Sequence, residues 1–461
     1  MKLSILLPGF LITGGIILLA ESSHAMTWQR TPVALASGTL ANPTAVPLTH
    51  AVGILSSENA LHLRVLLSAP VLGNASRIRM TSVLDGQSQT LNAAQLENWG
   101  NSSAIFNGGA VRLEVIVAPG DAGVSVNVAE ILVDAGAPRM DDCCPRRATR
   151  TLCGPDNRGA STDNRVGRIN GGCTGWLVSN GAVLTAGHCG IAGGSIFEVN
   201  VPASAANGAT VAAAVQDQFP VTAGSITTVN NGVGDDWTVC RIGANSLGQF
   251  AHQMHGFFRM TRELPGVGQT TRITGCGIDN SPQGSQPLVC GNTNTAGVCT
   301  HFGLNAQNQT LQTSTGTFAS ESGGGARISL QYAVDTEPAN SGSPIIWEAT
   351  GFTVGIHTAG GCSSGGGSNN GTSFELDALE NAVAAVPGGN VRYLDTLKVP
   401  GGAEDGTVFQ PHDTLAEAVN ATPGNGRLSI VRGNYTGAAN RGFFNKPMVL
   451  SAPVGAVTFG Q

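Results

Sequence analysis

The chain has 461 residues, too many for one core of ordinary domain size, so roughly two to four domains are expected. Its net charge of -6, without any run of Lys or Arg, argues against nucleic acid as a partner. Charged residues make up only 12% of the chain, and short alternating apolar runs outnumber long helical stripes. The expected fold class is therefore mostly β.

The first 25 residues predict an exported protein. A lysine, an apolar stretch and the small residues Ser23 and Ala25 form the pattern of a secretory signal peptide, 1–25, cleaved after Ala25. Pro8 and the glycines that follow it interrupt the apolar stretch, which argues against a retained membrane anchor. Ten cysteines in an exported chain indicate disulfides. We therefore expect a secreted protein, extracellular or periplasmic, with no membrane association after removal of the signal.

Residues 26–140 predict a β-rich N-terminal domain. They contain no cysteine, and Gly, Asn and Asp clusters separate their strand-like runs. This spacing is typical of a β-sandwich. The sequence offers no acid pair or nucleophile arrangement here, so a folding-assisting or propeptide-like role is expected. The runs are Leu61–Leu67, Arg77–Leu84, Val111–Val117 and Gly123–Val133.

Residues 141–166 form a cysteine-containing linker or processing region. The stretch "MDDCCPRRATRTLCG" holds three cysteines and three arginines. Bonds near Arg147 or Arg150 are candidates for proteolytic processing, which would make the protein a zymogen. An ordinary disulfide-stapled linker is an equally good interpretation.

Residues 390–461 predict a small C-terminal module. A helix-like "TLAEAV" is followed by three short strand candidates near Leu428, Met448 and Val457. The spacing resembles the first coils of a right-handed parallel β-helix. A surface polysaccharide is a possible ligand of such a module, and a small irregular module is the alternative.

The stretch "CTGWLVSNGAVLTAGHC" contains the first candidate catalytic residue, His188. Asn180-Gly181 between two apolar runs predicts a β-hairpin. Cys173 and Cys189 then lie on the two sides of this hairpin, and a disulfide between them would fix the loop that carries His188. A histidine held rigidly in this way is suited to act as a general base.

Two further stretches complete a possible catalytic group. In "GDDWTVCRIG", Asp236 leads into a strand and can orient an imidazole, whereas Asp235 would project to the other face. In "DTEPANSGSPII", Ser341 needs such a base to become a nucleophile. Each stretch alone could equally be an ordinary turn, so only their combination indicates a catalytic group.

Together the three stretches resemble chymotrypsin-like (trypsin-like) serine peptidases, in the order His188, Asp236, Ser341 and with spacings of 48 and 105 residues. The resemblance covers the predicted peptidase domain, 167–389, and implies two antiparallel six-stranded β-barrels with the site between them. It implies Ser341 as nucleophile, His188 as general base and Asp236 as its orienting acid. The oxyanion hole would use the N–H groups of Ser341 and Ala339, although the family usually has Gly at the latter position. Neither a metal nor an organic cofactor is implied.

Within this family the sequence is most similar to bacterial glutamyl endopeptidases. Thr336, the "SGSP" ending and His357 in "VGIHTAGG" carry this resemblance, and they imply cleavage of proteins or peptides after Glu or Asp. A competing interpretation uses Asp335 to bind Arg or Lys, as in trypsin-type enzymes. An alternative from another class is an exported binding or adhesion protein whose peptidase-like domain is inactive.

Overall fold

The computed structural model describes residues 28–134, 151–279 and 306–460, apart from positions 207, 364, 387, 389, 398–401, 403, 442 and 443. The predicted signal peptide, 1–25, and the processing candidates Arg147 and Arg150 lie outside these residues. No helix within the described ranges is long and apolar enough to cross a membrane.

The N-terminal region consists of two antiparallel sheets around one apolar core. We call this region, residues 28–134, the sandwich. In β8 the side chains of Val111, Leu113, Val115 and Val117 are fully buried, because alternate positions of a strand share one face. The first sheet contains β1 (Trp28–Ala36), β2 (Leu40–Ala41), β9 (Ala122–Asp134), β4 (His62–Val71) and β7 (Phe106–Asn107). The second contains β3 (Leu48–Ser56), β8 (Ala110–Val117), β5 (Arg77–Ser82) and β6 (Ser88–Leu91), followed by helix α1 (Ala93–Asn98).

The first central sheet is a curled half-barrel, which carries His188 and Asp236. Its ends approach each other at one isolated bridge between Val221 and Ile242. Strands β14 and β15 are only three residues long, and a single bridge joins the two sides here in place of a ladder. The strand order is β15 (Gln218–Pro220), β14 (Ile196–Glu198), β11 (Val166–Ile169), β12 (Cys173–Leu177), β13 (Val183–Thr185), β17 (Asp236–Cys240) and β16 (Thr227–Asn230). The short helices η2 (Gly187–Cys189) and η3 (Val215–Asp217) precede β14 and β15.

The second central sheet closes into a six-stranded barrel, because β19 pairs with both β18 and β20. It consists of β19 (Gln312–Gly324), β18 (Thr270–Gly275), β21 (Pro344–Trp347), β22 (Phe352–Ala359), β23 (Asn369–Ser373) and β20 (Arg327–Ala333), with β10 (Gly159–Ala160) added at β19. A closed barrel and a curled half-barrel are the arrangement of the chymotrypsin fold, so the predicted mostly β, chymotrypsin-like fold class is confirmed. Helices α2 (Ala251–His255) and α3 (Asp377–Ala385) lie outside the sheets.

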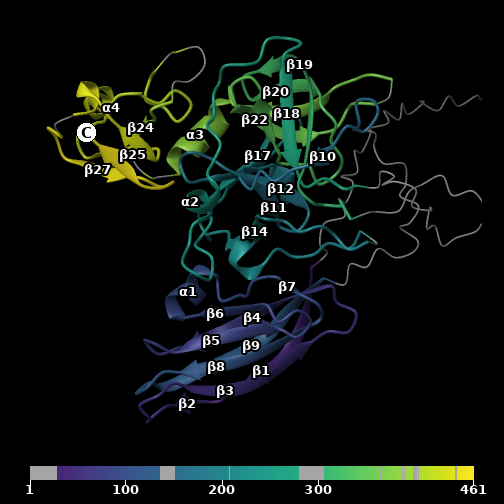
Figure 1. The fold of residues 1–461 in the computed structure, drawn as a ribbon, viewed down its shortest axis with the longest axis vertical. Coiled ribbons are helices and arrows are strands. Elements are labelled where there is room, and N and C mark those ends of the chain that lie inside the picture. The colour runs from purple at the N-terminus through teal and green to yellow at the C-terminus, as the bar shows by residue number, and fades with distance from the viewer. Residues whose placement is uncertain are drawn as a thin grey trace, which may run out of the picture.

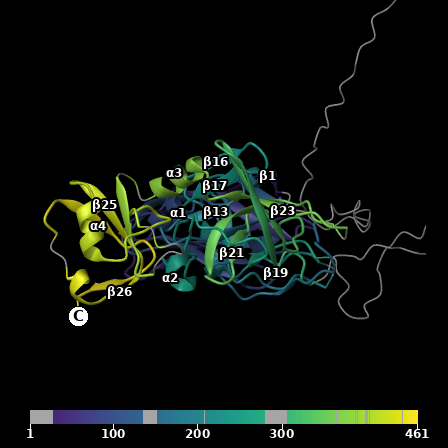
Figure 2. The same cartoon turned by 90° about the horizontal axis from the view of Figure 1, so that it is seen from above.

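The C-terminal region forms short parallel strands. Figures 1 and 2 both place it (yellow) beside α3, and Phe409 packs on Phe374 with ring centroids 4.9 Å apart. Asp395 pairs with Arg259 of the central region, and this ion pair ties the two parts together. One parallel sheet contains β24 (Val391–Leu394), β25 (Gly426–Ile430) and β27 (Met448–Ser451), and the other contains β26 (Gly433–Tyr435) and β28 (Val457–Phe459). Helix α4 (Leu415–Ala421) lies between β24 and β25 in the chain, and the turn η4 (Ala438–Asn440) lies between β26 and β27.

Candidate active site

His188 and Asp236 are joined by two hydrogen bonds. Nδ1 of His188 lies 2.6 Å from Oδ2 of Asp236, and the backbone N–H of His188 donates to Oδ1 at 2.9 Å. The hairpin β12–β13 and the short helix η2 position the histidine, and Cys173 and Cys189 form a disulfide across this hairpin. The histidine ring therefore has one orientation, with its side chain 36% exposed and Nε2 left for a substrate or nucleophile.

Asp236 is buried and its backbone is held by the second barrel. Its N–H donates to Oγ1 of Thr372 at 3.2 Å, and the Thr372 hydroxyl donates to the Asp236 carbonyl at 3.1 Å. Asp235 points elsewhere, because its two oxygens accept from Trp237 Nε1 and Asn231 Nδ2. The alternation of the strand thus sends only one of the two adjacent aspartates to the histidine.

Ser341 lies in the loop before β21, next to the His188 hairpin. Its carbonyl accepts from the N–H of Thr174 at 2.9 Å and lies 3.9 Å from Cys189 Sγ. Gly342 follows at a φ of 91°, where an added Cβ would come within 2.1 Å of the Thr174 carbonyl, so only glycine fits this close approach. Among the residues that the structure describes, Ser341 Oγ makes no hydrogen bond to His188, as is common for such pairs before substrate binds.

Two backbone donors in the Ser341 loop are left free. The N–H groups of Asn340, Gly342 and Ser343 bind carbonyl oxygens, whereas those of Ala339 and Ser341 have no acceptor among the described residues. The carbonyl of Pro338 accepts from Ile278, so the N–H of the same peptide, that of Ala339, points the opposite way. Buried N–H groups are nearly always satisfied, so two free ones beside a candidate nucleophile fit an oxyanion hole.

Ala339 adopts a backbone conformation that alanine rarely takes. Its φ is 76°, and its carbonyl accepts from Oγ1 of Thr174 at 3.0 Å. The left-handed region costs an L-residue with a Cβ about 1–2 kcal/mol. Ala339 is therefore strained where the family usually has Gly, and the surrounding loop holds it in this conformation.

The central region matches one protein family. Residues 157–375 fit the model of the trypsin family. This part of the chain is a trypsin-like serine endopeptidase domain. The predicted resemblance to chymotrypsin-like serine peptidases is thus confirmed, and we refer to the region below as the protease domain.

Similar solved structures share little sequence with the chain, and no curated protein matches it. They include a Glu endopeptidase in complex with MPD, a thermostable serine protease AL20 from an extremophilic microorganism and the protease Anisep from Arthrobacter nicotinovorans. These are 19%, 15% and 16% identical, cover 50%, 49% and 50% of this chain and 97%, 98% and 99% of their own, and have TM-scores of 0.34, 0.34 and 0.33.

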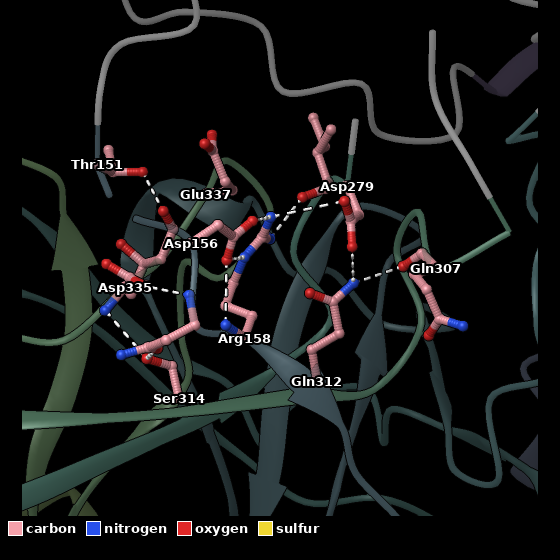
Figure 3. A network of polar contacts seen from close by, with 12 residues as sticks. Thr151, Asp156, Arg158, Asp279, Gln307, Gln312, Ser314, Asp335 and Glu337 are labelled. Atoms are coloured by element: carbon pink, nitrogen blue, oxygen red, sulfur yellow. Dashed lines mark hydrogen bonds and ion pairs between the residues drawn. The ribbon is translucent and has the colours of Figure 1, made fainter. Parts of the chain in front are cut away.

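Two of the candidate specificity residues, Asp335 and Thr336, contact the segment that starts at Thr151, and Figure 3 shows Asp335 beside Thr151. Asp335 is buried, and its two oxygens accept from the N–H groups of Cys153 at 2.6 Å and Asn157 at 2.8 Å. The Thr151 hydroxyl donates to the carbonyl of Thr336. Asp335 therefore fixes this entering segment of the protease domain.

The Thr336 hydroxyl accepts from Asn369 Nδ2 at 3.0 Å, and the same amide nitrogen donates to the carbonyl of Thr151. A disulfide between Cys153 and Cys362 ties the entering segment to the loop after β22. Asn369 and Cys153 were not singled out from the sequence, because only the folded chain brings them to Thr336.

His357 is buried at 3% exposure, and its Nδ1 lies 2.7 Å from the hydroxyl of Tyr332. Burial, with a smaller contribution from the charge of His188, lowers the pKa of His357 to about 3. The Tyr332 hydroxyl is also within donating distance, 3.1 Å, of the Asn370 carbonyl. The sequence contained no signal for Tyr332, which approaches His357 across the barrel from β20.

Glu337 is a second acidic residue of the Ser341 loop, and the sequence interpretation did not use it. It is 7% exposed, and no dashed line reaches its carboxylate in Figure 3. Burial raises its pKa to about 7 against the influence of Arg158, and Asp156, Asp279 and Asp335 add to the rise. Arg158 itself is engaged with Asp156 at 2.8 Å, so the Glu337 carboxylate has a charge nearby but no hydrogen bond among the described residues.

Two groups of described residues gather metal-ligand side chains. In the first, Cys173, His188 and Cys189, both cysteines are in the disulfide and offer no thiolate. The second, Glu404, His412 and Glu417, lies in the C-terminal region away from His188. Neither group is used as a metal site in the chemistry proposed below.

Proposed function

We propose that the protein is a secreted serine endopeptidase that uses Ser341, His188 and Asp236 and cleaves after Glu or Asp. The observation that carries the proposal is the combination of the doubly bonded His188–Asp236 pair with the two free N–H groups at Ala339 and Ser341. A base and an oxyanion site on the two barrels are what acyl transfer needs.

In the proposed reaction, Oγ of Ser341 attacks the scissile carbonyl while Nε2 of His188 takes the hydroxyl proton. Asp236 keeps the other proton on Nδ1 and stabilises the imidazolium that forms. The carbonyl oxygen becomes negative and accepts from the N–H groups of Ala339 and Ser341. His188 then protonates the leaving amine, and water hydrolyses the acyl-enzyme by the same steps.

The environment of His357 supports the acidic preference. Charging a histidine with a pKa of about 3 at pH 7 would cost about 5 kcal/mol, so the neutral ring is the relevant form. If the Tyr332 hydroxyl donates to Nδ1, the ring proton is on Nε2, which can then donate to a substrate carboxylate. Thr336 has a hydroxyl proton to donate as well, since Asn369 occupies only its oxygen.

The contacts of Asp335 argue against cleavage after Arg or Lys. Both of its oxygens already accept from backbone N–H groups of the entering segment. A carboxylate used in this way is a structural anchor, so it offers a basic substrate side chain a weaker partner than a free carboxylate would.

Export and the domain division belong to the same proposal. The two disulfides are expected of an oxidising compartment, which fits a protein secreted after removal of residues 1–25. We divide the mature chain into an N-terminal domain 26–140, a linker 141–166, the protease domain 167–389 and a C-terminal module 390–461.

The test is cleavage of a mixed peptide library by the secreted protein, scored by the residue before each cut, with Ser341→Ala as control. Cuts after Glu or Asp that vanish in the control are expected. Cuts after Arg or Lys would retain the catalytic residues and overturn the specificity. If no cut depended on Ser341 and a fluorophosphonate failed to label it, the catalytic assignment would be wrong and the binding-protein alternative would be favoured.

A further inference from the structure

A buried glutamine of the protease domain binds the backbone of the sandwich. Gln218 in β15 is fully buried, and its Nε2 donates to the carbonyls of Ile105 and Ala213, both at 2.8 Å. Its Oε1 accepts from the N–H of Ile105 at 2.7 Å. The side chain therefore pairs with Ile105 as a neighbouring strand would, and separation would break both bonds at once.

Further hydrogen bonds cross the same boundary on either side of Gln218. They connect η3, the segment before it and the loop after β17 with strands and helix α1 of the sandwich. They include Ala212 N to Asn107 Oδ1 (2.8 Å), Val215 N to Gln87 Oε1 (2.9 Å), Gln95 Nε2 to Ser246 O (3.0 Å) and Asn98 Nδ2 to Ala244 O (3.1 Å).

The two parts also share one apolar core. Ile196, Ala212 and Val215 of the protease domain belong to the same buried cluster as Ile105 and Phe106 of the sandwich, and each is at most 4% exposed. Release of the sandwich would expose these side chains to water. Independent domains that separate easily usually meet through more polar surfaces.

Buried charges lie on both sides of the boundary. Glu198 of β14 is fully buried with Arg168, 2.9 Å away. Arg64 of the sandwich is 6% exposed; burial lowers its pKa to about 10, and the carboxylate of Glu198 raises it. Glu198 therefore attracts a guanidinium from each side, and separation would remove one of these attractions.

These contacts lie away from the candidate catalytic residues. In the strand order, β14 and β15 are at one end of the half-barrel, whereas His188 and Asp236 belong to β13, η2 and β17 at the other. Figure 1 shows the sandwich (purple to blue) against β14 and below α2. The sandwich therefore packs against the β14–β15 end of the half-barrel. None of the contacts described above involves His188.

We propose that the sandwich, residues 28–134, is a permanent part of the protease and stays bound to the half-barrel when the connection between Asp134 and Thr151 is cut. A released propeptide would instead leave Gln218 and the shared core exposed. The inference rests on the interface alone and is independent of the proposed substrate and catalytic residues.

The test uses the full chain with Ser341→Ala, which prevents self-digestion, and with the recognition sequence of an unrelated site-specific protease inserted between Asp134 and Cys143. All residues before Cys143 lack cysteine, so no disulfide can hold the N-terminal fragment after cutting. Gel filtration after the cut, at micromolar concentration and without denaturant, should give one peak that contains both fragments. Two separate peaks would overturn the proposal.

Variants of the same cut protein locate the interaction. Gln218→Ala should raise the dissociation constant of the fragments at least about tenfold, because the N–H and the carbonyl of Ile105 both lose their hydrogen bonds to Gln218. Gln253→Ala, at an exposed glutamine of α2, is the matched control and should leave the constant unchanged. If Gln218→Ala does not fold, Asn98→Ala at the rim should weaken binding in its place. Unaltered binding in the folded variant would mean that this interface does not hold the fragments.

Discussion

The His188 side of the candidate site and the Ser341 side differ in how their polar groups are satisfied. On the first side, His188 and Asp236 are joined by two hydrogen bonds, and Thr372 holds the backbone of Asp236. On the second, two N–H groups have no described acceptor, Ala339 has a φ of 76°, and the buried Glu337 carboxylate has no hydrogen bond among the described residues.

This difference separates two ways of preparing a catalytic site. The acid–base pair is complete before substrate arrives, so its hydrogen bonds also stabilise the fold. In the proposed mechanism the Ser341 loop offers its two unbonded N–H groups to an oxyanion, and unbonded N–H groups, backbone strain and a buried carboxylate reduce folding stability. Substitutions on the first side should therefore mainly lower kcat. Substitutions on the second side should raise the free energy of unfolding, because they remove features that destabilise the fold.

The largest effect is expected from Asp236→Asn. The amide cannot accept from both the ring N–H and the backbone N–H of His188 as the carboxylate does, so the tautomer needed for base catalysis is lost. The value of kcat should fall by about 10⁴-fold. Steady-state kinetics on a peptide substrate measures this.

Asp235→Asn is the matched control, because that residue binds Trp237 and Asn231 instead of the histidine. Its kcat should change by less than about tenfold. An equal loss in both variants would contradict the assignment of Asp236 as the orienting acid.

Glu337→Gln should stabilise the protein at high pH. The pKa of Glu337 in the fold, about 7, lies above its ordinary value of 4.5, so the folded state holds this proton longer than the unfolded chain. Stability is therefore lost as pH rises from about 4.5 to 7, and a neutral glutamine removes this loss. The gain should approach about 3 kcal/mol at pH 8 and vanish near pH 4.

Chemical denaturation at pH 4, 6 and 8, in protein that also carries Ser341→Ala, measures the difference. The exposed Glu58→Gln serves as control and should show no such pH dependence. A gain from Glu337→Gln that is equal at all three values would show that ionisation of this carboxyl is not its cause.

Tyr332→Phe should weaken the preference for glutamate. In the proposed specificity site the Tyr332 hydroxyl donates to Nδ1 of His357, so its removal no longer directs the ring proton to Nε2. The kcat/KM for a peptide with Glu before the scissile bond should fall about tenfold, mainly through KM, while the same peptide with Gln changes little.

The buried Tyr435, which binds backbone carbonyls in the C-terminal region, supplies the control Tyr435→Phe. Equal losses for the Glu and Gln peptides would remove Tyr332 and His357 from the specificity site.

The local sequence patterns indicated the candidate catalytic side chains, and the structure shows that His188 and Asp236 bind each other. His188, Asp236 and Ser341 each occur in a short local pattern, and the Asn180-Gly181 turn showed that Cys173 and Cys189 would meet. These features depend on residues close together in the chain.

The contacts around the pocket depend on residues far apart. Cys153 pairs with Cys362 across a separation of 209 residues, and Ile105 binds Gln218 at a separation of 113. A single sequence contains no local signal for such pairs, because they form only when whole sheets have packed.

The smallest effect is expected from Ala339→Gly. Glycine removes the cost of about 1–2 kcal/mol for a Cβ at positive φ but adds about 0.5–1 kcal/mol of chain entropy in the unfolded state. The net gain in unfolding free energy is about 0.5–1 kcal/mol. Because only the backbone N–H serves the oxyanion, kcat should stay within about twofold. Ala418→Gly, in the helix α4, should instead lose about 1 kcal/mol. A loss of stability in both variants would show that the loop does not store strain at Ala339, and the contrast between the two sides of the site would then rest on the open N–H groups and Glu337 alone.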